Sequence, residues 1–191
     1  MAAVTSVAAC DPGSSAGAVV RLDIERRAVT LAAEWQTMAA APTRGRPVPA
    51  MRWRVWVEGG ETMERFFPLD APASFNEAIG LWPTPDVAAV EAIAWYGSGG
   101  PDTLVLAESA GRAVEWLRAL GVEPLRPKAS EWRKAVLGLS PRTPAKEAER
   151  AAVLACQRGH LPRLPDGITS GHAAEACAIA WWAAHRGLCA R

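Results

Sequence analysis

The sequence has almost no net charge: 21 lysine and arginine residues against 20 aspartate and glutamate residues give a formal charge of +1. This excludes binding to nucleic acid through a global positive charge and leaves only a local basic patch. Cysteine is also scarce, and the spacing of the four cysteines does not match a paired metal motif. They are Cys10, Cys156, Cys177 and Cys189. Three of them lie in apolar runs, where buried free thiols are ordinary, which favours a reducing compartment.

Long hydrophobic segments are missing as well. No apolar run reaches the roughly 18 residues of a membrane span, and no signal peptide precedes the first predicted strand. We therefore expect a cytoplasmic protein. With 191 residues and 50% apolar content, the chain can bury a full core. We expect one domain over residues 1–191, with an insertion at about 36–82.

Asp11 lies between two apolar runs, Val4–Ala9 and Ala18–Leu22. These runs predict a short strand and its antiparallel neighbour, and Pro12–Gly17 has the composition of the hairpin between them. Asp11 would then end the first strand at the rim of a sheet. Asp-Pro-Gly is also a common turn sequence, so a role limited to capping the turn stays open.

Two further strands have distinct patterns. Ala28–Trp35 completes a meander of three strands, and residues 36–49 have the composition of a loop. The alternation in Met51–Val57 places Met51, Trp53, Val55 and Val57 on one face and Arg52, Arg54 and Trp56 on the other. Arginine interleaved with tryptophan can bind a nucleic-acid backbone and stack on bases. A hairpin that only packs on the core fits the pattern at least as well.

A second acid, Glu108, follows the apolar run Thr103–Ala107. This run predicts a strand buried on both faces, whereas the spacing in Val87–Ala94 predicts a helix. A helix over Arg112–Leu120 and a fifth core strand over Val122–Arg126 would follow. A strand, a helix and a strand in this order imply a right-handed crossover and parallel pairing.

The C-terminal part predicts three helices. The first is capped by Ser130, and the second opens at Pro144 and extends to about Gln157. The last, Thr169–Trp182, is apolar on nearly all sides.

In that last helix, only His172 and Glu175 interrupt the apolar sequence, and their spacing places them on one face. A buried carboxylate beside an imidazole is costly unless it is paired or binds a cation. The two residues either satisfy each other or form a site with Asp11 and Glu108.

Three motifs together resemble the RuvC family of Holliday-junction resolvases: DPG after the first strand, an acid closing LVLAES, and HAAEACAIA on the final helix. Between them, EPLRPKASEWRKAVLG is similar to the family's fifth strand and basic helix. The resemblance covers most of the chain. It implies an α/β, ribonuclease H-like fold with a mixed five-stranded sheet flanked by helices. The sheet would combine the antiparallel meander of three strands with parallel strands, and a hairpin would be inserted.

The resemblance also implies four catalytic and metal-binding positions, namely Asp11, Glu108, His172 and Glu175. Phosphodiester hydrolysis with two Mg²⁺ ions needs carboxylates that hold both ions, and an imidazole in the set makes Mn²⁺ a reasonable substitute. Asp11 would bridge the ions, and Glu108 and Glu175 would bind one each. His172 would complete the second site or shuttle a proton. DNA contacts would come from Arg133, Lys134, Lys146, Arg54 and Trp56.

The implied activity is metal-dependent endonucleolytic resolution of four-way DNA junctions. Symmetric cutting predicts a homodimer, with the helix Arg112–Leu120 as the expected interface. In the family, a mobile loop with a wedging aromatic follows the second acid, and Glu108 lacks such a loop. A related nuclease acting on flaps, forks or RNA-containing duplexes is therefore an alternative. A catalytically inactive nucleic-acid-binding protein of the same fold is another.

Overall fold

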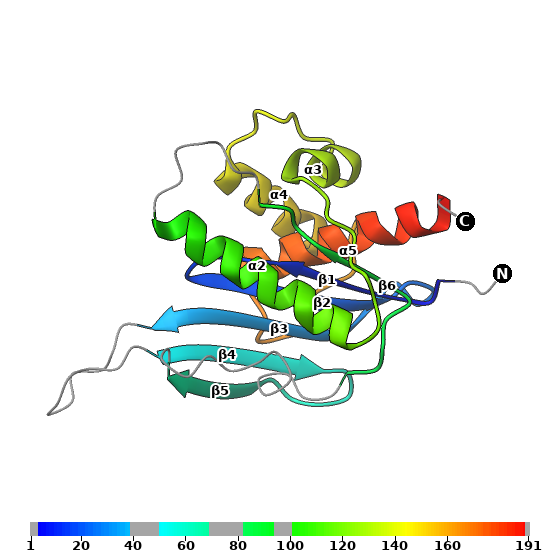
Figure 1. The fold of residues 1–191 in the computed structure, drawn as a ribbon. Helices are drawn as coiled ribbons and strands as arrows, with labels where there is room; N and C mark the ends of the chain where they lie inside the picture. Colours follow the sequence, from blue (N-terminus) through cyan, green and yellow to red (C-terminus); the bar gives the residue numbers. More distant parts are fainter. Residues whose placement is uncertain (1–3, 39–49, 69–81, 94–100, 190–191) are drawn as a thin grey trace, which may run out of the picture.

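The computed structural model describes residues 4–38, 50–68, 82–93 and 101–189, and its centre is one mixed sheet (Figure 1). The strands are β1 (Ser6–Asp11), β2 (Ala16–Asp23), β3 (Ala28–Met38), β4 (Ala50–Val57), β5 (Met63–Pro68) and β6 (Val87–Val90). Their order in the sheet is β5-β4-β3-β2-β1-β6. Each strand from β1 to β5 pairs antiparallel with the next strand in the chain, and β6 pairs parallel with β1.

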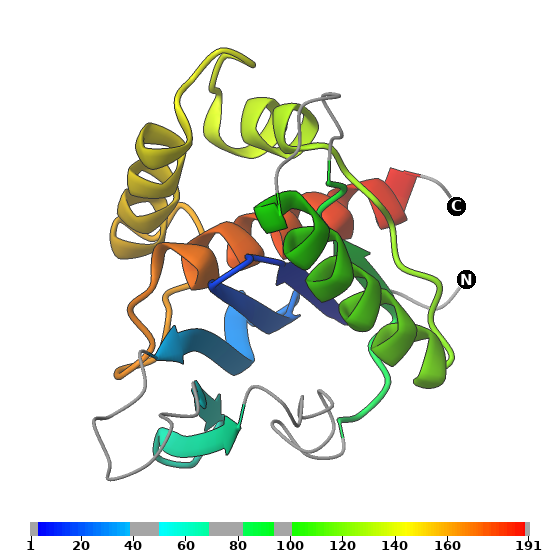
Figure 2. The same ribbon diagram turned by 60° about the vertical axis from the view of Figure 1, so that its left-hand side comes forward.

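The described helices cover both faces of this sheet (Figure 2). They are α2 (Pro101–Ala119), α3 (Ala129–Leu137), α4 (Ala145–Gln157) and α5 (Gly171–Cys189). On one face α5 packs on β1 and β2, with α3 and α4 outside it, and α2 lies on the other face. Because β1 is covered on both faces, Val7 to Cys10 are all buried. None of the described helices is long and apolar enough to cross a lipid bilayer.

The expected fold class is confirmed: an antiparallel meander, β1 to β3, continues into a strand parallel to β1, with helices on both faces. The sheet has six strands where five were expected, because the hairpin β4–β5 pairs with β3 and extends the same sheet. The alternation in β4 is also as expected. Trp53 and Val55 are buried in the core under α2, and Trp56 is partly buried against the core under α5.

The segment after α2 takes the place of the expected fifth core strand. It lies alongside β6 in parallel, with isolated bridges from Ala89 to Leu125 and from Ala92 to Lys128. The amide of Leu125 donates to Ala88 O at 2.8 Å, and the amide of Val90 donates to Leu125 O at 2.9 Å. Proline at position 127 has no amide hydrogen, so the ladder does not extend into a regular strand.

Two predicted elements are wrong: the segment expected to be a helix is a strand, and the segment expected to be a strand is part of a helix. Val87–Val90 is the strand β6, and Thr103–Ala107 lies within the helix α2. A short apolar run has no periodicity that separates a buried strand from a helix. In α2, Leu104 and Val105 are 63% and 46% exposed, so this apolar run faces solvent and not the inside of a sheet.

Trp53 offers a direct test of this packing. Its side chain is 2% exposed and its ring lies 4.9 Å from that of Trp35. We expect Trp53→Ala to lower the free energy of unfolding by about 3–5 kcal/mol in urea denaturation, because it leaves a large cavity. Phe66→Ala on β5, where the side chain is 59% exposed, serves as the control and should change stability by less than about 0.5 kcal/mol. Equal effects of the two substitutions would contradict this packing.

Candidate metal centre

Asp11 ends β1, one of the inner strands of the sheet, between β2 and β6. It pairs with Ala18 of β2, and the preceding residue, Cys10, pairs with Val90 of β6. The Asp11 side chain is almost fully buried. A carboxylate in this position is costly unless charged or polar groups surround it, and three such groups come from other elements.

Two of these groups come from α5. His172 Nδ1 lies 2.6 Å from Asp11 Oδ2, and Glu175 follows one turn later with a side chain that is 8% exposed. Asp11, His172 and Glu175 each offer a ligand atom, and these atoms lie within 4.8 Å of one another. The structure therefore brings together three of the four site residues expected from the sequence. Ser170 caps α5, since its Oγ accepts the amide of Ala173 at 3.1 Å.

The third group is Glu91, which directly follows β6 and was missed from the sequence. Its amide donates to Cys10 O at 3.1 Å, and its carboxyl group is hydrogen-bonded to Asp11. Since β1 and β6 are parallel, both strands end at the same edge of the sheet, with an acid at each end. The available signal was the buried run VAAV followed by Glu, which helical spacing concealed.

Glu108 does not lie at the end of a central strand, and that expectation is wrong. It lies on α2, where its side chain is 60% exposed and forms an ion pair with Arg112 one turn away. The ligand atoms that lie within 4.8 Å of one another come from Asp11, His172 and Glu175, so neither Glu108 nor Glu91 belongs to that set, although Glu91 is hydrogen-bonded to Asp11. The acid that ends a strand beside Asp11 is Glu91.

The cluster is defined here as Asp11, Glu91, His172 and Glu175. Its acids lie close enough together to raise one another's pKa values. Burial and the neighbouring Asp11 raise the pKa of Glu91 to about 9. The same two causes raise the pKa of Glu175 to about 7, against the opposing effects of Arg133 and His172. The hydrogen bond to Asp11 raises the pKa of His172. Without a further positive charge, the cluster holds protons at neutral pH.

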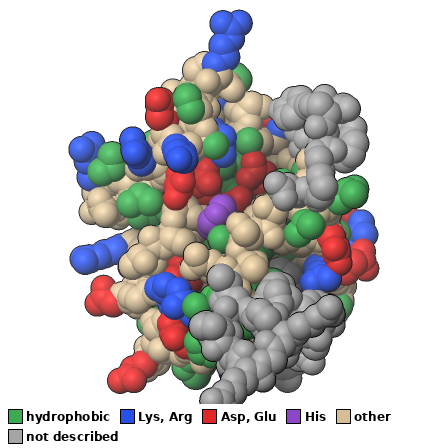
Figure 3. Space-filling model, turned by 90° about the vertical axis from the view of Figure 1, so that its left-hand side faces the viewer, with side chains coloured by type: hydrophobic (Ala, Val, Ile, Leu, Met, Phe, Trp, Pro, Cys, Tyr) green, Lys and Arg blue, Asp and Glu red, His purple; other side chains and the backbone are tan. Residues whose placement is uncertain are grey.

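These residues fit a divalent cation. Carboxylate oxygens with an imidazole nitrogen form a donor set suited to Mg²⁺ or Mn²⁺, and a bound cation would favour the ionised acids. The face at this end of the sheet shows acidic side chains around a histidine, bordered by lysine and arginine side chains (Figure 3). The cluster could therefore hold a metal ion.

The basic residues expected to bind DNA occupy different environments. Arg133 on α3 donates from Nη2 to Glu175 Oε1 at 2.9 Å, so it belongs to the edge of the cluster. Lys134 and Lys146 are exposed on α3 and α4. Arg54 forms an ion pair with Glu34 at 3.2 Å, and Trp56 packs against the core. Of these five side chains, only that of Arg133 contacts the cluster directly.

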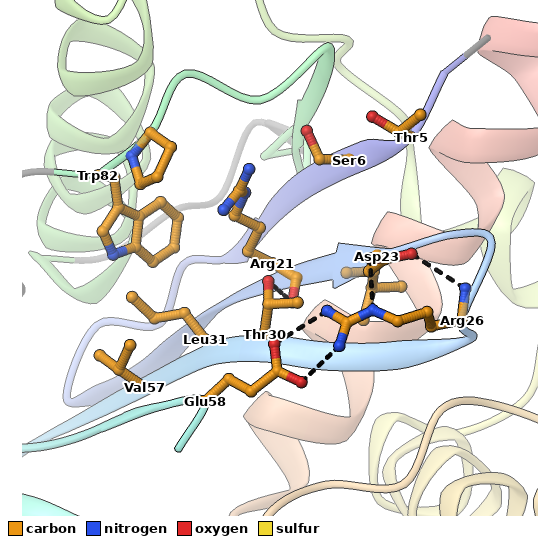
Figure 4. A pocket seen from close by; sticks show the side chains of 12 residues that line it. Thr5, Ser6, Arg21, Asp23, Arg26, Thr30, Leu31, Val57, Glu58 and Trp82 are labelled. Carbon is orange, nitrogen blue, oxygen red and sulfur yellow. Dashed lines mark hydrogen bonds and ion pairs between the residues drawn. The ribbon is translucent and has the colours of Figure 1, made fainter. Parts of the chain in front are cut away.

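A cavity of about 450 Å³ lies where β1 to β3 approach Trp82, and it contains two more acids (Figure 4). Arg26 lies between Asp23 and Glu58 and pairs with both, at 2.7 Å in each case. Hydrogen bonds from Arg26 lower the pKa of both acids. Two arginines, Arg26 and Arg21, line the cavity with these two carboxylates, so this cavity lacks the unbalanced negative charge of the cluster around Asp11.

Comparisons with known proteins were made on both sequence and structure. No family model and no curated protein matches the sequence. Among solved structures, RuvC of T. thermophilus in complex with a Holliday junction substrate is similar at 17% identity and a TM-score of 0.45, over 97% of this chain and 94% of that chain. Thermus thermophilus RuvC is similar at 19% identity and a TM-score of 0.43, over 97% and 95%. Both TM-scores are low, so the fold assignment depends on the strand topology described above.

The raised pKa values predict how stability depends on pH without metal. Between the ordinary pKa of a glutamate and about 9, folded Glu91 keeps a proton that the unfolded chain has released. Stability should therefore fall as pH rises from 5.5 to 8.5, and the shifts of Glu175 and His172 act in the same direction. Thermal melting in EDTA should show a loss of at least about 1.4 kcal/mol, equivalent to one pKa unit.

Glu91→Gln removes the most strongly shifted group, so its stability should vary less with pH. Glu108→Gln is the matched control and should keep the parental profile, since Glu108 is exposed on α2. A Glu91→Gln profile as steep as that of the parent would contradict the described environment of Glu91.

Proposed function

We propose that the protein is a divalent-metal-dependent, structure-specific endodeoxyribonuclease that resolves four-way DNA junctions by phosphodiester hydrolysis. The observation that carries this proposal is that ligand atoms of Asp11, His172 and Glu175 lie within 4.8 Å of one another, with Glu91 hydrogen-bonded to Asp11. His172 is the most accessible of them, with 37% of its side chain exposed, and lysine and arginine side chains border the histidine on this face (Figure 3). A cytoplasmic location is part of the same proposal and is consistent with the free thiols of Cys10, Cys156 and Cys177.

The proposed metal ligands are Asp11, Glu91 and Glu175, with Mg²⁺ as the physiological ion and Mn²⁺ as a substitute. Bound divalent ions supply Lewis acidity for phosphodiester hydrolysis. Asp11 would help to hold the cation, because it is hydrogen-bonded to Glu91 and offers a ligand atom within 4.8 Å of one from Glu175. His172, bonded to Asp11 Oδ2, completes the ligand set or holds a proton at Nδ1. Arg133 contacts Glu175 and is placed to neutralise a backbone phosphate.

With Glu91 in place of Glu108 as the second acid, the expected substrate must be considered again. Glu108 is not followed by a loop with a wedging aromatic, which weakened the case for a four-way junction as substrate. After Glu91, residues 92–100 precede α2 and contain Trp95 and Tyr96 in the sequence. Residues 94–100 lie outside the described part of the chain. Aromatic residues thus follow the second acid in sequence, as the resemblance to the RuvC family implies.

The two acids give a sharp test. Asp11→Asn and Glu91→Gln should each lower cleavage of a labelled four-way junction in Mg²⁺ by roughly a hundredfold or more, because each removes charge that holds metal. Junction binding in EDTA should persist, since phosphate contacts supply most of the affinity. Glu108→Gln should cleave within about twofold of the parent, because exposed surface substitutions usually have small effects.

Labelled forks, flaps and RNA–DNA hybrids, tested beside the junction, distinguish the alternatives. Preferred cleavage of a fork, flap or hybrid would replace junction resolution by a related nuclease activity. Binding without cleavage of any substrate, in Mg²⁺ and in Mn²⁺, would favour the inactive binding protein. Loss of activity in Glu108→Gln but not in Glu91→Gln would refute the proposed ligand set.

The expected homodimer is part of this proposal, but its interface needs correction. Trp116 and Leu117, two expected interface residues on α2, are buried in the core of their own chain. Leu104 and Val105, near the start of α2, are exposed and available for a partner.

We expect light scattering to show a dimer for the parent. Leu104→Glu should shift it towards monomer without lowering the melting temperature, because the side chain is 63% exposed. Leu154→Glu, on α4 and 44% exposed, is the control and should leave the dimer intact. A monomeric parent at working concentrations would remove the case for paired cutting.

A further inference from the structure

The inserted hairpin β4–β5 contacts the segment that leads into α5. Arg54 Nη1 donates to Gly167 O at 3.2 Å, and Thr62 Oγ1 donates to Asp166 O at 2.9 Å. Gly167 has a φ of +85°, and a β-carbon there would collide with Thr62. Glycine at this position therefore permits both the turn and the close approach of the hairpin.

Glu34 of β3 links this hairpin to Ser170, the residue directly before α5. Its side chain is only 8% exposed, and both of its oxygens have partners. Oε1 lies 3.2 Å from Arg54 Nη1, and Oε2 accepts the amide of Ser170 at 3.0 Å. A buried carboxylate with a defined partner on each oxygen fixes the positions of both partners.

Ser170 directly precedes α5, so its position affects the cluster. The Ser170 hydroxyl caps the helix by accepting the amide of Ala173. His172 is the second residue of α5, and Glu175 lies one turn further on. A shift of Ser170 would move the imidazole away from Asp11, with which it forms a contact of 2.6 Å.

We propose that Glu34 and Arg54 are positioning residues: they fix the start of α5 so that His172 and Glu175 face Asp11. This gives the hairpin a role in building the site, in place of the DNA contact expected for Arg54. The inference depends on the proposed function in one respect, because it takes the cluster to be a metal centre. Groups behind metal ligands commonly change metal affinity by roughly 10–100-fold when they are removed.

Two substitutions of Glu34 test the two bonds separately. Glu34→Gln keeps an oxygen that can accept the Ser170 amide but loses the ion pair with Arg54. Glu34→Met removes both bonds at similar volume. Glu64→Gln is the matched control, because Glu64 also pairs with Arg54, at 3.7 Å, but is 48% exposed and forms no described bond to residues 165–170.

The first measurement is hydrogen–deuterium exchange of a peptide covering residues 168–176 in EDTA. Glu34→Met should accelerate exchange by about tenfold, Glu34→Gln by less, and Glu64→Gln not at all. Unchanged exchange in both Glu34 variants would overturn the inference, whether or not the protein binds metal. If Glu34→Met fails to fold, the comparison of Glu34→Gln with Glu64→Gln decides the question.

The second measurement is Mn²⁺ affinity by calorimetry, well below the melting temperature of each variant. Glu34→Met should weaken Mn²⁺ binding by about tenfold, and Glu64→Gln should bind like the parent. A purely stabilising role would lower the melting temperature and leave the affinity unchanged, and that result would overturn the inference. Absence of Mn²⁺ binding to the parent would count against the proposed function, and the exchange experiment would then decide the inference alone.

Discussion

Repulsion between three carboxylates in one partly buried space is the constraint on which the candidate site depends. Asp11, Glu91 and Glu175 cannot all ionise there unless positive charge is supplied, and the raised pKa values of the two glutamates express this. His172 and Arg133 supply part of the charge. The remaining imbalance is of the kind that a divalent cation removes.

The sheet creates this crowding through its topology. β1 and β6 are neighbours and run parallel, so the acids at their ends meet at one edge of the sheet. α5 packs across β1 and β6 and brings His172 and Glu175 to the same edge. Buried backbone hydrogen bonds hold the strands in register, as in the bond between Glu91 N and Cys10 O. The strand ends that carry Asp11 and Glu91 therefore cannot separate without breaking the core, and without a cation the crowding is relieved by protonation, as the raised pKa values of Glu91 and Glu175 show.

Several arginines of this protein form ion pairs with acids. Arg26 pairs with Asp23 and Glu58, Arg112 with Glu108, and Arg54 with Glu34. This use of arginine explains why a chain with a net charge of +1 can carry Arg-rich strands without presenting a broad basic surface. Exposed lysines on α3 and α4 are then the better candidates for contacts with a phosphate backbone.

Sequence reasoning identified Asp11, His172 and Glu175 because local patterns define them. An acid after an apolar run and before Pro-Gly marks the end of a strand, and two polar residues in a helix otherwise rich in Ala, Cys, Ile and Trp must share a buried site. The second acid escaped this reasoning. The helical spacing in VAAVEAIA led to the prediction of a helix, and the apolar run TLVLA led to the prediction of a strand. Both predictions were wrong, because short apolar segments fit a buried strand and a helix equally well.

By itself, then, the sequence determined the meander, the C-terminal helices and three members of the cluster, since these follow from periodicity and local charge. The cap expected at Ser130 is wrong, because α3 begins at Ala129 with Lys128 as its N-cap. Only the tertiary structure decided that Glu91, and not Glu108, stands beside Asp11, and that Arg54 pairs with Glu34 beneath the start of α5. The reason is physical: which apolar run enters the sheet depends on pairing with β1, a contact across about 80 residues of chain. Likewise, whether an arginine faces DNA or a buried acid depends on partners that no local pattern specifies.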